Sequence, residues 1–267
     1  MLLNFRHEAV LKEEATNALL IKPDGVYIDA TFGRGGHSKA ILDLLGRDGK
    51  LIAIDRDPEA IAAANELQLN DSRLKVVHAP FSAIKDIKET SGCANSVDGI
   101  LFDLGVSSPQ LDDAERGFSF LRDGPLDMRM NPLSGINAAD WINTAKESEI
   151  ADVFFKFGDE KYSRRMAKQI IRKRATQRIT RTEQLAEILK EANPAWEKEK
   201  HPATRAFQAI RILINQEFDE LESGLNGSLS LLRGGGRLVV ISFHSLEDRI
   251  VKRFMVDREK GDNFPRG

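Results

Sequence analysis

The stretch VYIDATFGRGGHS, residues 26–38, decides how the chain folds. A short apolar run ends at Asp29, a turn holds Gly33, Gly35 and Gly36, and the following AILDLL has the apolar spacing of a helix. Glycine has no Cβ and reaches positive φ at little cost, so backbone can approach a ligand closely at such a turn. The order of strand, glycine turn and helix predicts a binding site for a nucleotide-type cofactor.

A second acidic residue supports this prediction. Asp55 ends the next apolar run, about 20 residues after the turn, where a carboxylate can accept both ribose hydroxyls. A dinucleotide fingerprint would place a third Gly or Ala where Ser38 stands, whereas the acid followed by glycines in DATFGRG fits the turn of S-adenosylmethionine (SAM) enzymes. An ordinary tight turn is the alternative at this point.

Composition is that of a globular chain. It has 267 residues, 41% of them hydrophobic and 30% charged, with a net charge of -2. Whole-chain charge therefore predicts no polyanion partner, and any nucleic-acid surface must come from local clustering. The single cysteine, Cys93, excludes an internal disulfide and a multi-cysteine metal site, and we expect no metal. We find no membrane span or signal peptide and expect a cytoplasmic protein.

Strands and helices alternate through the first part of the chain. We expect strands at 26–30, 50–55, 74–78 and 97–104, with helices at 8–20, 58–67 and 82–89 between or before them. Strands rich in Val, Ile and Leu with intervening helices predict an α/β fold with a parallel sheet covered on both faces. Ligands of such sheets bind at the carboxyl ends of the strands, where the chain places Asp29, Asp55, Phe81 and Asp103.

The alternation stops after residue 104, and an inserted all-helical domain is predicted. Its helices are expected at 138–143, 147–157, 162–175 and 182–192, the last with a capping box of Thr180 and Glu183. A long helical pattern over 201–232 ends at three glycines, and a strand at 237–243 resumes the sheet. A final helix over 246–256 has Ser245 and Asp248 as an N-cap pair. We expect a discontinuous domain, 1–112 and 213–267, and a helical insertion, 113–212.

One segment of the insertion is strongly basic. Residues 161–181 contain nine cations and no acid. On a helix, Tyr162, Met166 and Ile170 form an apolar stripe. The cations left outside that stripe are Arg164, Arg165, Lys168 and Arg172. A solvated face is the usual fate of a charge run, but uncompensated cations repel one another, which favours binding of a phosphate backbone, and hence of RNA.

The stretch DLGVSSPQLDDAERGFSF, residues 103–120, is similar to the RsmH (MraW) family. The resemblance extends to FRHEAVL, DATFGRGGHS, IAIDRDP, PLDMRM, HPATRAFQAIRI and ISFHSLEDRIVK, and so to nearly the whole chain. It implies a Rossmann-like SAM-methyltransferase sheet with a helical insertion. It also implies methylation of the exocyclic N4 amine of a cytidine in 16S ribosomal RNA of the small subunit.

The resemblance assigns residues to the cofactor. With Gly33 from the turn, they are Gly35, Gly36, His37, Asp55, Phe81, Asp103 and Gln110. Asp55 suits the ribose hydroxyls, and Phe81 offers an apolar face to adenine. Asp103 and Gln110 can hydrogen-bond the methionyl end or the adenine edge. Two of these have ordinary structural alternatives, since Phe81 could be core and His37 a helix-start residue.

Catalysis of this kind is chiefly alignment of nitrogen, methyl and sulfur, with acceptors that draw the amine lone pair out of the ring. Amino-methyltransferases commonly use an Asp/Asn-Pro-Pro-aromatic loop after strand four. Here Asp103 keeps the acidic position, but the proline pair and the adjacent aromatic are absent. The acceptor role is left between Asp103, the hydroxyls of Ser107 and Ser108, and carbonyls near Pro109. Methylation at cytosine carbon 5 is disfavoured because Cys93 lies in a polar turn.

Alternatives remain at two points. His244 either contacts the target nucleotide or lies beside a helix cap formed by Ser245. The family continues beyond residue 267, so we expect an open sheet edge in this chain. A non-catalytic RNA-binding or ribosome assembly factor is the main alternative function, and a nicotinamide-dependent oxidoreductase is a third. The sequence leaves open the oligomeric state, with a homodimer as one option, and whether free RNA or the assembled subunit is the substrate.

Overall fold

The computed structural model describes residues 9–193 and 201–260. The chain divides into two compact units, which we call unit 1 (residues 1–105 and 218–267) and unit 2 (residues 106–217). The FRHE motif at 5–8 and the final residues 261–267 lie outside the described residues.

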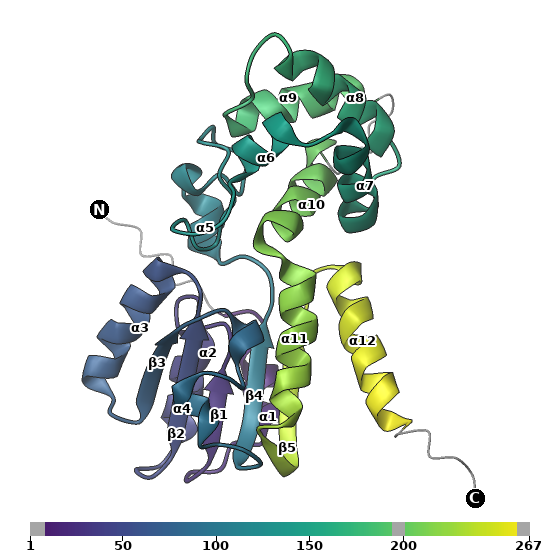
Figure 1. The fold of residues 1–267 in the computed structure, drawn as a ribbon. Coiled ribbons are helices and arrows are strands. Elements are labelled where there is room, and N and C mark those ends of the chain that lie inside the picture. The colour runs from purple at the N-terminus through teal and green to yellow at the C-terminus, as the bar shows by residue number, and fades with distance from the viewer. Residues whose placement is uncertain (1–8, 194–200, 261–267) are drawn as a thin grey trace, which may run out of the picture. The chain divides into compact units, whose positions relative to one another are not determined.

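Unit 1 is built on a five-stranded sheet (Figure 1). The strands are β1 (Val26–Asp29), β2 (Lys50–Asp55), β3 (Leu74–His78), β4 (Val97–Asp103) and β5 (Leu232–Ile241). They are ordered β3-β2-β1-β4-β5, and every neighbouring pair is parallel. The predicted α/β fold with a parallel sheet is confirmed. Among the described residues β5 pairs on one side only, with β4.

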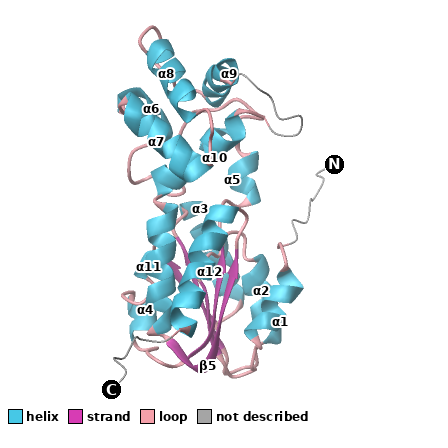
Figure 2. Ribbon diagram, turned by 90° about the vertical axis from the view of Figure 1, so that its right-hand side faces the viewer, coloured by secondary structure: helices cyan, strands magenta, loops and turns pink. Residues whose placement is uncertain are grey.

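Helices cover both faces of this sheet, as a parallel sheet requires (Figure 2). On one face Tyr27 and Leu101 pack against α1 (Lys12–Leu19), α2 (Gly36–Leu44) and α3 (Pro58–Asn70). On the other, Ile28 and Phe102 pack against α11 (Glu217–Leu229) and α12 (Ser245–Glu259). Successive strand residues point to opposite faces, so both faces of these strands are apolar. Two short turns of helix follow β3, namely η1 (Phe81–Ala83) and α4 (Lys88–Ser91).

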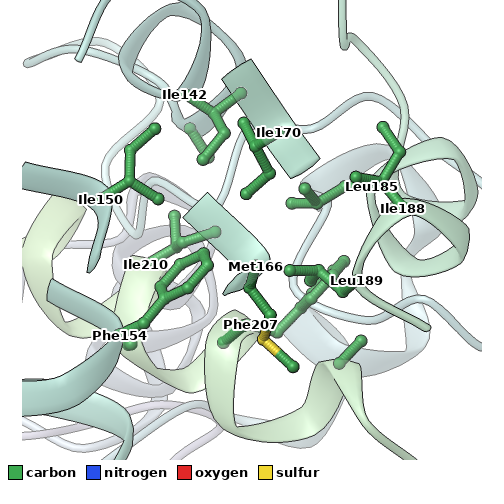
Figure 3. Packing of buried hydrophobic residues seen from close by; sticks show 14 of the residues in the cluster. Ile142, Ile150, Phe154, Met166, Ile170, Leu185, Ile188, Leu189, Phe207 and Ile210 are labelled. Atoms are coloured by element: carbon green, nitrogen blue, oxygen red, sulfur yellow. The ribbon is translucent and has the colours of Figure 1, made fainter. Parts of the chain in front are cut away.

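Unit 2 is helical within the described residues. It contains α5 (Ser108–Asp112), η2 (Ala114–Arg116), α6 (Ala138–Thr144), α7 (Glu147–Gly158), α8 (Ser163–Arg174), α9 (Thr182–Ala192) and α10 (Ala203–Asn215). Its core is an apolar cluster in which Phe154, Met166 and Ile170 are fully buried (Figure 3). Met166 and Ile170 belong to the apolar stripe expected on α8, and their burial leaves the charged face of that helix outside.

Several element boundaries differ from the expectation. The helical pattern at 201–232 is two helices, because Gln216 adopts a left-handed conformation with φ 51° that no helix can continue through. β5 begins at Leu232, so the three glycines lie within the strand rather than before it. The single helix expected at 82–89 is divided into η1 and α4.

Both expected N-terminal caps were wrong. α9 has Arg181 at its N-cap without a side-chain cap, since the N–H of Thr180 donates instead to Gln184. α12 begins at Ser245 and is capped by His244, whose ring nitrogen accepts the N–H of Glu247. Caps depend on one residue of register, which apolar periodicity does not determine.

Candidate functional site

The turn after β1 is organised by a buried carboxylate. Asp29 is fully buried, and its Oδ2 accepts the hydroxyl of Ser38 at 2.6 Å while Oδ1 accepts the N–H of Thr31 at 3.2 Å. Burial raises the pKa of Asp29. The hydroxyl oxygen of Thr31 in turn accepts the N–H of Asp103 at 2.7 Å. Asp29 therefore shapes the turn and connects it to the end of β4.

Two of the glycines of the turn, Gly35 and Gly36, are required by the packing of the chain itself. Gly35 has φ 76°, and a Cβ there would lie 2.6 Å from the ring of Phe32. A Cβ at Gly36 would lie 2.8 Å from the Cβ of Ala9. Glycine is therefore needed at these two positions because Phe32 and Ala9 approach closely. The expected approach of a ligand would be a second reason.

Asp55 closes the turn from the end of β2. Its Oδ2 accepts the N–H of Gly33 at 2.8 Å, and its Oδ1 accepts the N–H of Asp57 at 2.8 Å. Burial raises the pKa of Asp55 to about 6, against the lowering effect of these two N–H groups. Each carboxylate oxygen has a second lone pair, and the side chain is only partly buried, so the group retains acceptor capacity for hydroxyl donors.

Asp103, at the end of β4, has an orphaned oxygen. Its Oδ1 is buried and has no hydrogen-bond partner among the described residues, while its Oδ2 lies 3.5 Å from Nδ1 of His37. Burial raises the pKa of Asp103 to about 6; His37 lowers it, and the nearby acids Asp29 and Glu247 raise it further. A buried acceptor without a donor is costly, and such atoms concentrate at functional sites.

His37 holds Asp103 from the side. The ring is 4% exposed, and its Nε2 lies 3.1 Å from the carbonyl oxygen of Val10, which can only accept. Nε2 therefore carries a hydrogen, and the other nitrogen faces the Asp103 carboxylate. Both ring nitrogens are thus directed at acceptors of the protein.

Phe81 begins η1 just beyond β3. It is partly buried and packs edge-on against Phe102, with ring centroids 5.4 Å apart and planes at 88°. Both of its expected roles, core and adenine face, are compatible with this half-buried position. Together with Asp29, Asp55 and Asp103, it lies at the carboxyl ends of the unit 1 strands.

The remaining expected cofactor and catalytic residues belong to unit 2. Gln110 is 7% exposed, and its Oε1 accepts the N–H of Ser107 at 2.9 Å, which closes the first turn of α5. Ser107 is the N-cap of that helix and Ser108 its first residue. Gln110 thus has a local structural role, and its contact with the cofactor stays a prediction.

His244 is engaged with Glu247. Nδ1 accepts the Glu247 N–H at 3.3 Å, and Nε2 lies 3.0 Å from Oε1 of the same residue. Glu247 is 2% exposed and was not among the expected site residues; its only signal in the sequence is an acid three positions after His244. A contact between His244 and the target nucleotide stays a prediction.

The basic segment is partly neutralised. Lys173 pairs with Glu191 at 2.8 Å, and Arg178 and Arg181 pair with acids of neighbouring segments. The expectation of nine uncompensated cations was therefore wrong, because three find partners in the tertiary structure. Five exposed cations form no ion pair within residues 9–193 and 201–260, namely Lys161, Arg164, Arg165, Lys168 and Arg172.

Two other classes of site are absent from residues 9–193 and 201–260. Within those residues no helix is both long and apolar enough to span a membrane. No three His, Cys, Asp or Glu side chains of the same residues gather as ligands for a metal ion.

The strand order, the glycine turn and the acids that end the strands define the class of fold: the chain has a Rossmann-like α/β sheet whose ligand edge carries Asp29, Asp55 and Asp103. A family model covers nearly all of it. The chain belongs to the MraW methylase family, whose model matches residues 4–267.

Solved structures resemble parts of the chain at low identity. A SAM-dependent methyltransferase of Aquifex aeolicus is 22% identical over 35% of this chain and 47% of its own, with a TM-score of 0.30. An rRNA methylase of Streptococcus thermophilus is 13% identical over 35% of this chain and 53% of its own, with a TM-score of 0.28. TYW2 of P. horikoshii, solved with MeSAdo, is 24% identical over 35% of this chain and 34% of its own, with a TM-score of 0.27. The matched part spans about half of these relatives or less, so the assignment rests on the family model.

Proposed function

We propose that this protein transfers a methyl group from SAM to the exocyclic N4 amine of a cytidine in 16S ribosomal RNA of the small subunit. The observation that carries the proposal is the orphaned Oδ1 of Asp103, a buried acceptor at the sheet edge where ligands of this fold bind. An exocyclic amine is one donor that would satisfy such an acceptor. The motifs shared with the RsmH family, DLGVSSPQ above all, support the same substrate.

SAM fits the residues of the turn. Asp55 would hold the ribose hydroxyls, Phe81 the adenine, and the backbone of Gly33, Gly35, Gly36 and His37 the methionyl end, with Gln110 as a further contact. When bound, SAM supplies a methyl group on a positively charged sulfur, which is already a strong electrophile. The chain's own residues therefore need to align the amine and remove its proton.

Asp103 is proposed to do both. Ionised, it accepts an N–H of the amine and draws the nitrogen lone pair out of conjugation with the ring. As the nitrogen–methyl bond forms, the sulfur–methyl bond breaks, and the amine proton passes to the carboxylate. His37 is proposed as a positioning residue, since its Nδ1 lies 3.5 Å from Oδ2 and so leaves Oδ1 for the amine. Ser107 and Ser108 are the alternative acceptors.

Unit 2 is proposed to hold the RNA, within the insertion domain predicted at 113–212. The support is the charge of α8, where Arg164, Arg165, Lys168 and Arg172 are exposed and form no ion pair within the described residues. Lys and Arg without protein partners are suited to neutralise phosphates, a sequence-independent contribution to affinity. His244 is a further proposed RNA contact.

The test is transfer of labelled methyl from SAM to small ribosomal subunits that lack the modification, with free 16S RNA in parallel. We expect label on the cytidine amine with wild-type protein and a loss of at least about 100-fold in Asp103→Ala. Asp152→Ala, which removes an acid 69% exposed on α7, is the matched control and should transfer normally. SAM binding without any label in wild type would instead favour the non-catalytic assembly factor.

A further inference from the structure

An exposed aromatic ring lies at the carboxyl edge of the sheet. Phe243 is 56% exposed, although the neighbouring aromatic of β4, Phe102, is fully buried and Phe81 is half-buried. Phe243 stands two residues beyond the end of β5. It has no part in the cofactor site described above. Single exposed apolar side chains are common on protein surfaces, so what distinguishes Phe243 is its position beside the end of β4 and not its exposure alone.

The ring lies beside the acidic end of β4. Asp103 is in register with Ile241, and the N–H of Leu104 donates to the carbonyl of Ile241 at 3.0 Å, so the two strands end together. A Cβ built on Gly105 would lie 3.6 Å from Cδ2 of Phe243. The ring therefore lies against the backbone of Gly105, two residues after Asp103.

The backbone that carries this ring is held firmly. The N–H of Phe243 donates to Oε2 of Glu247 at 3.1 Å, and Glu247 is 2% exposed. His244, the next residue, caps α12. Because the backbone is bound on this side, the ring is presented to solvent at a defined place. Holding the backbone in advance lowers part of the entropy cost of binding a ligand to the ring.

We propose that Phe243 is the stacking surface for the target base, a proposal that rests on the proposed function. Asp103 ends β4, residues 104–110 after it contain no aromatic residue, and Phe243, just beyond β5, supplies one. An aromatic face stacks against any base, while the acceptor beside it selects for an amine. Stacking and hydrogen bonding together orient the base plane, which sets the direction of the amine lone pair toward the methyl group.

The first experiment compares four proteins in methyl transfer to unmodified small subunits at saturating SAM: wild type, Phe243→Ala, Phe243→Tyr and Leu69→Ala. Leu69 is 88% exposed on α3 of unit 1 and is the control for loss of an exposed apolar side chain. We expect kcat/KM for the subunit to fall about 10-fold or more in Phe243→Ala, to stay within about 2-fold in Phe243→Tyr, and to be unchanged in Leu69→Ala. SAM affinity, measured by calorimetry, should be equal in all four.

Two results overturn the proposal: normal transfer by Phe243→Ala, or equal losses in Phe243→Ala and Phe243→Tyr, which would indicate a structural role. Failure of wild type to transfer label would refute the proposed function, not the stacking site. In that case the test is the variant Phe243→Trp, and the measured quantity is the tryptophan fluorescence that it adds to that of wild type. This added fluorescence should be quenched by an RNA strand that contains cytidine, but not by the same strand with an abasic site in place of the cytidine. Equal fluorescence with both strands would refute the stacking site itself.

Discussion

At the scale of single residues, the site depends on two acids, Asp55 and Asp103, whose ionisation is disfavoured by burial. Burial raises the pKa of both Asp55 and Asp103 to about 6, roughly two units above the value of a solvated aspartate. A raised folded-state pKa means that the folded protein binds protons more tightly than the unfolded chain between about pH 4 and 6. Each of these acids therefore reduces stability progressively over that range, and the full cost remains above it.

The same shift predicts a pH dependence of activity. Asp103 must be ionised to accept the amine proton, so kcat/KM should fall tenfold per pH unit below about pH 6. Because His37 lowers the pKa of this acid, His37→Ala should move the acidic limb of the profile to higher pH. The measurement is the pH profile of methyl transfer under kcat/KM conditions in both proteins.

The control for this prediction is His78→Ala, which removes an exposed histidine whose Nε2 lies 3.1 Å from the carbonyl oxygen of Arg56. Its profile should coincide with wild type. A limb that stays near pH 6 in His37→Ala would contradict the positioning role of His37, even if the maximal rate falls.

At the scale of elements, the exposed cations of α8 are the feature that the packing of unit 2 does not explain. Reversing Arg164, Arg165 and Lys168 to Glu should weaken binding of 16S RNA by at least about 10-fold at moderate salt and flatten the salt dependence of the affinity. SAM binding should not change. Filter binding over a series of salt concentrations measures both quantities.

The matched control reverses Lys50, Lys75 and Lys85, three exposed cations of unit 1, and so changes the net charge by the same amount. We expect a much smaller effect on RNA. Equal weakening by both triple variants would mean that overall charge matters rather than the surface of α8.

The end of α10 is held by a buried amide. Asn215 is 2% exposed; its Oδ1 accepts the N–H of Met130 at 2.7 Å, and its Nδ2 donates to the carbonyl of Met128 at 2.7 Å. Asn215→Ala leaves buried backbone groups without partners and should lower the free energy of unfolding by about 2–3 kcal/mol. Urea unfolding measures this. Asn226→Ala, at an exposed amide on α11, is the control and should cost well under about 1 kcal/mol.

At the scale of the whole molecule, the cofactor should stabilise the folded chain. A ligand that binds only the native state at about 100 times its Kd adds about 2.7 kcal/mol. SAM should therefore raise the Tm of wild type by several degrees, and Asp55→Asn should lose most of that shift, since Asp55 is the proposed ribose acceptor. Differential scanning fluorimetry gives the comparison, with NAD as the control ligand. A shift with NAD and none with SAM would revive the oxidoreductase alternative.

Much of the fold could be predicted from the sequence because its signals are local. The apolar runs that end at Asp29, Asp55 and Asp103 are strands in the structure, and the stripe of Met166 and Ile170 is the buried side of α8. Both patterns arise because buried side chains recur at the fixed spacing of a strand or a helix, and this spacing can be read from the sequence. The shared motifs likewise predicted the family that the full-length match supports.

Only the tertiary structure decided what long-range contacts control. Whether a cation of 161–181 is paired depends on acids such as Glu191, Asp140 and Asp123, which come from other segments. The enclosure of His37 between Val10 and Asp103, and the ring of Phe243 beside Gly105, join residues far apart in the chain. Apolar periodicity reports which side of an element is buried, whereas the partner of a charge or a ring depends on how elements pack, which no local pattern records.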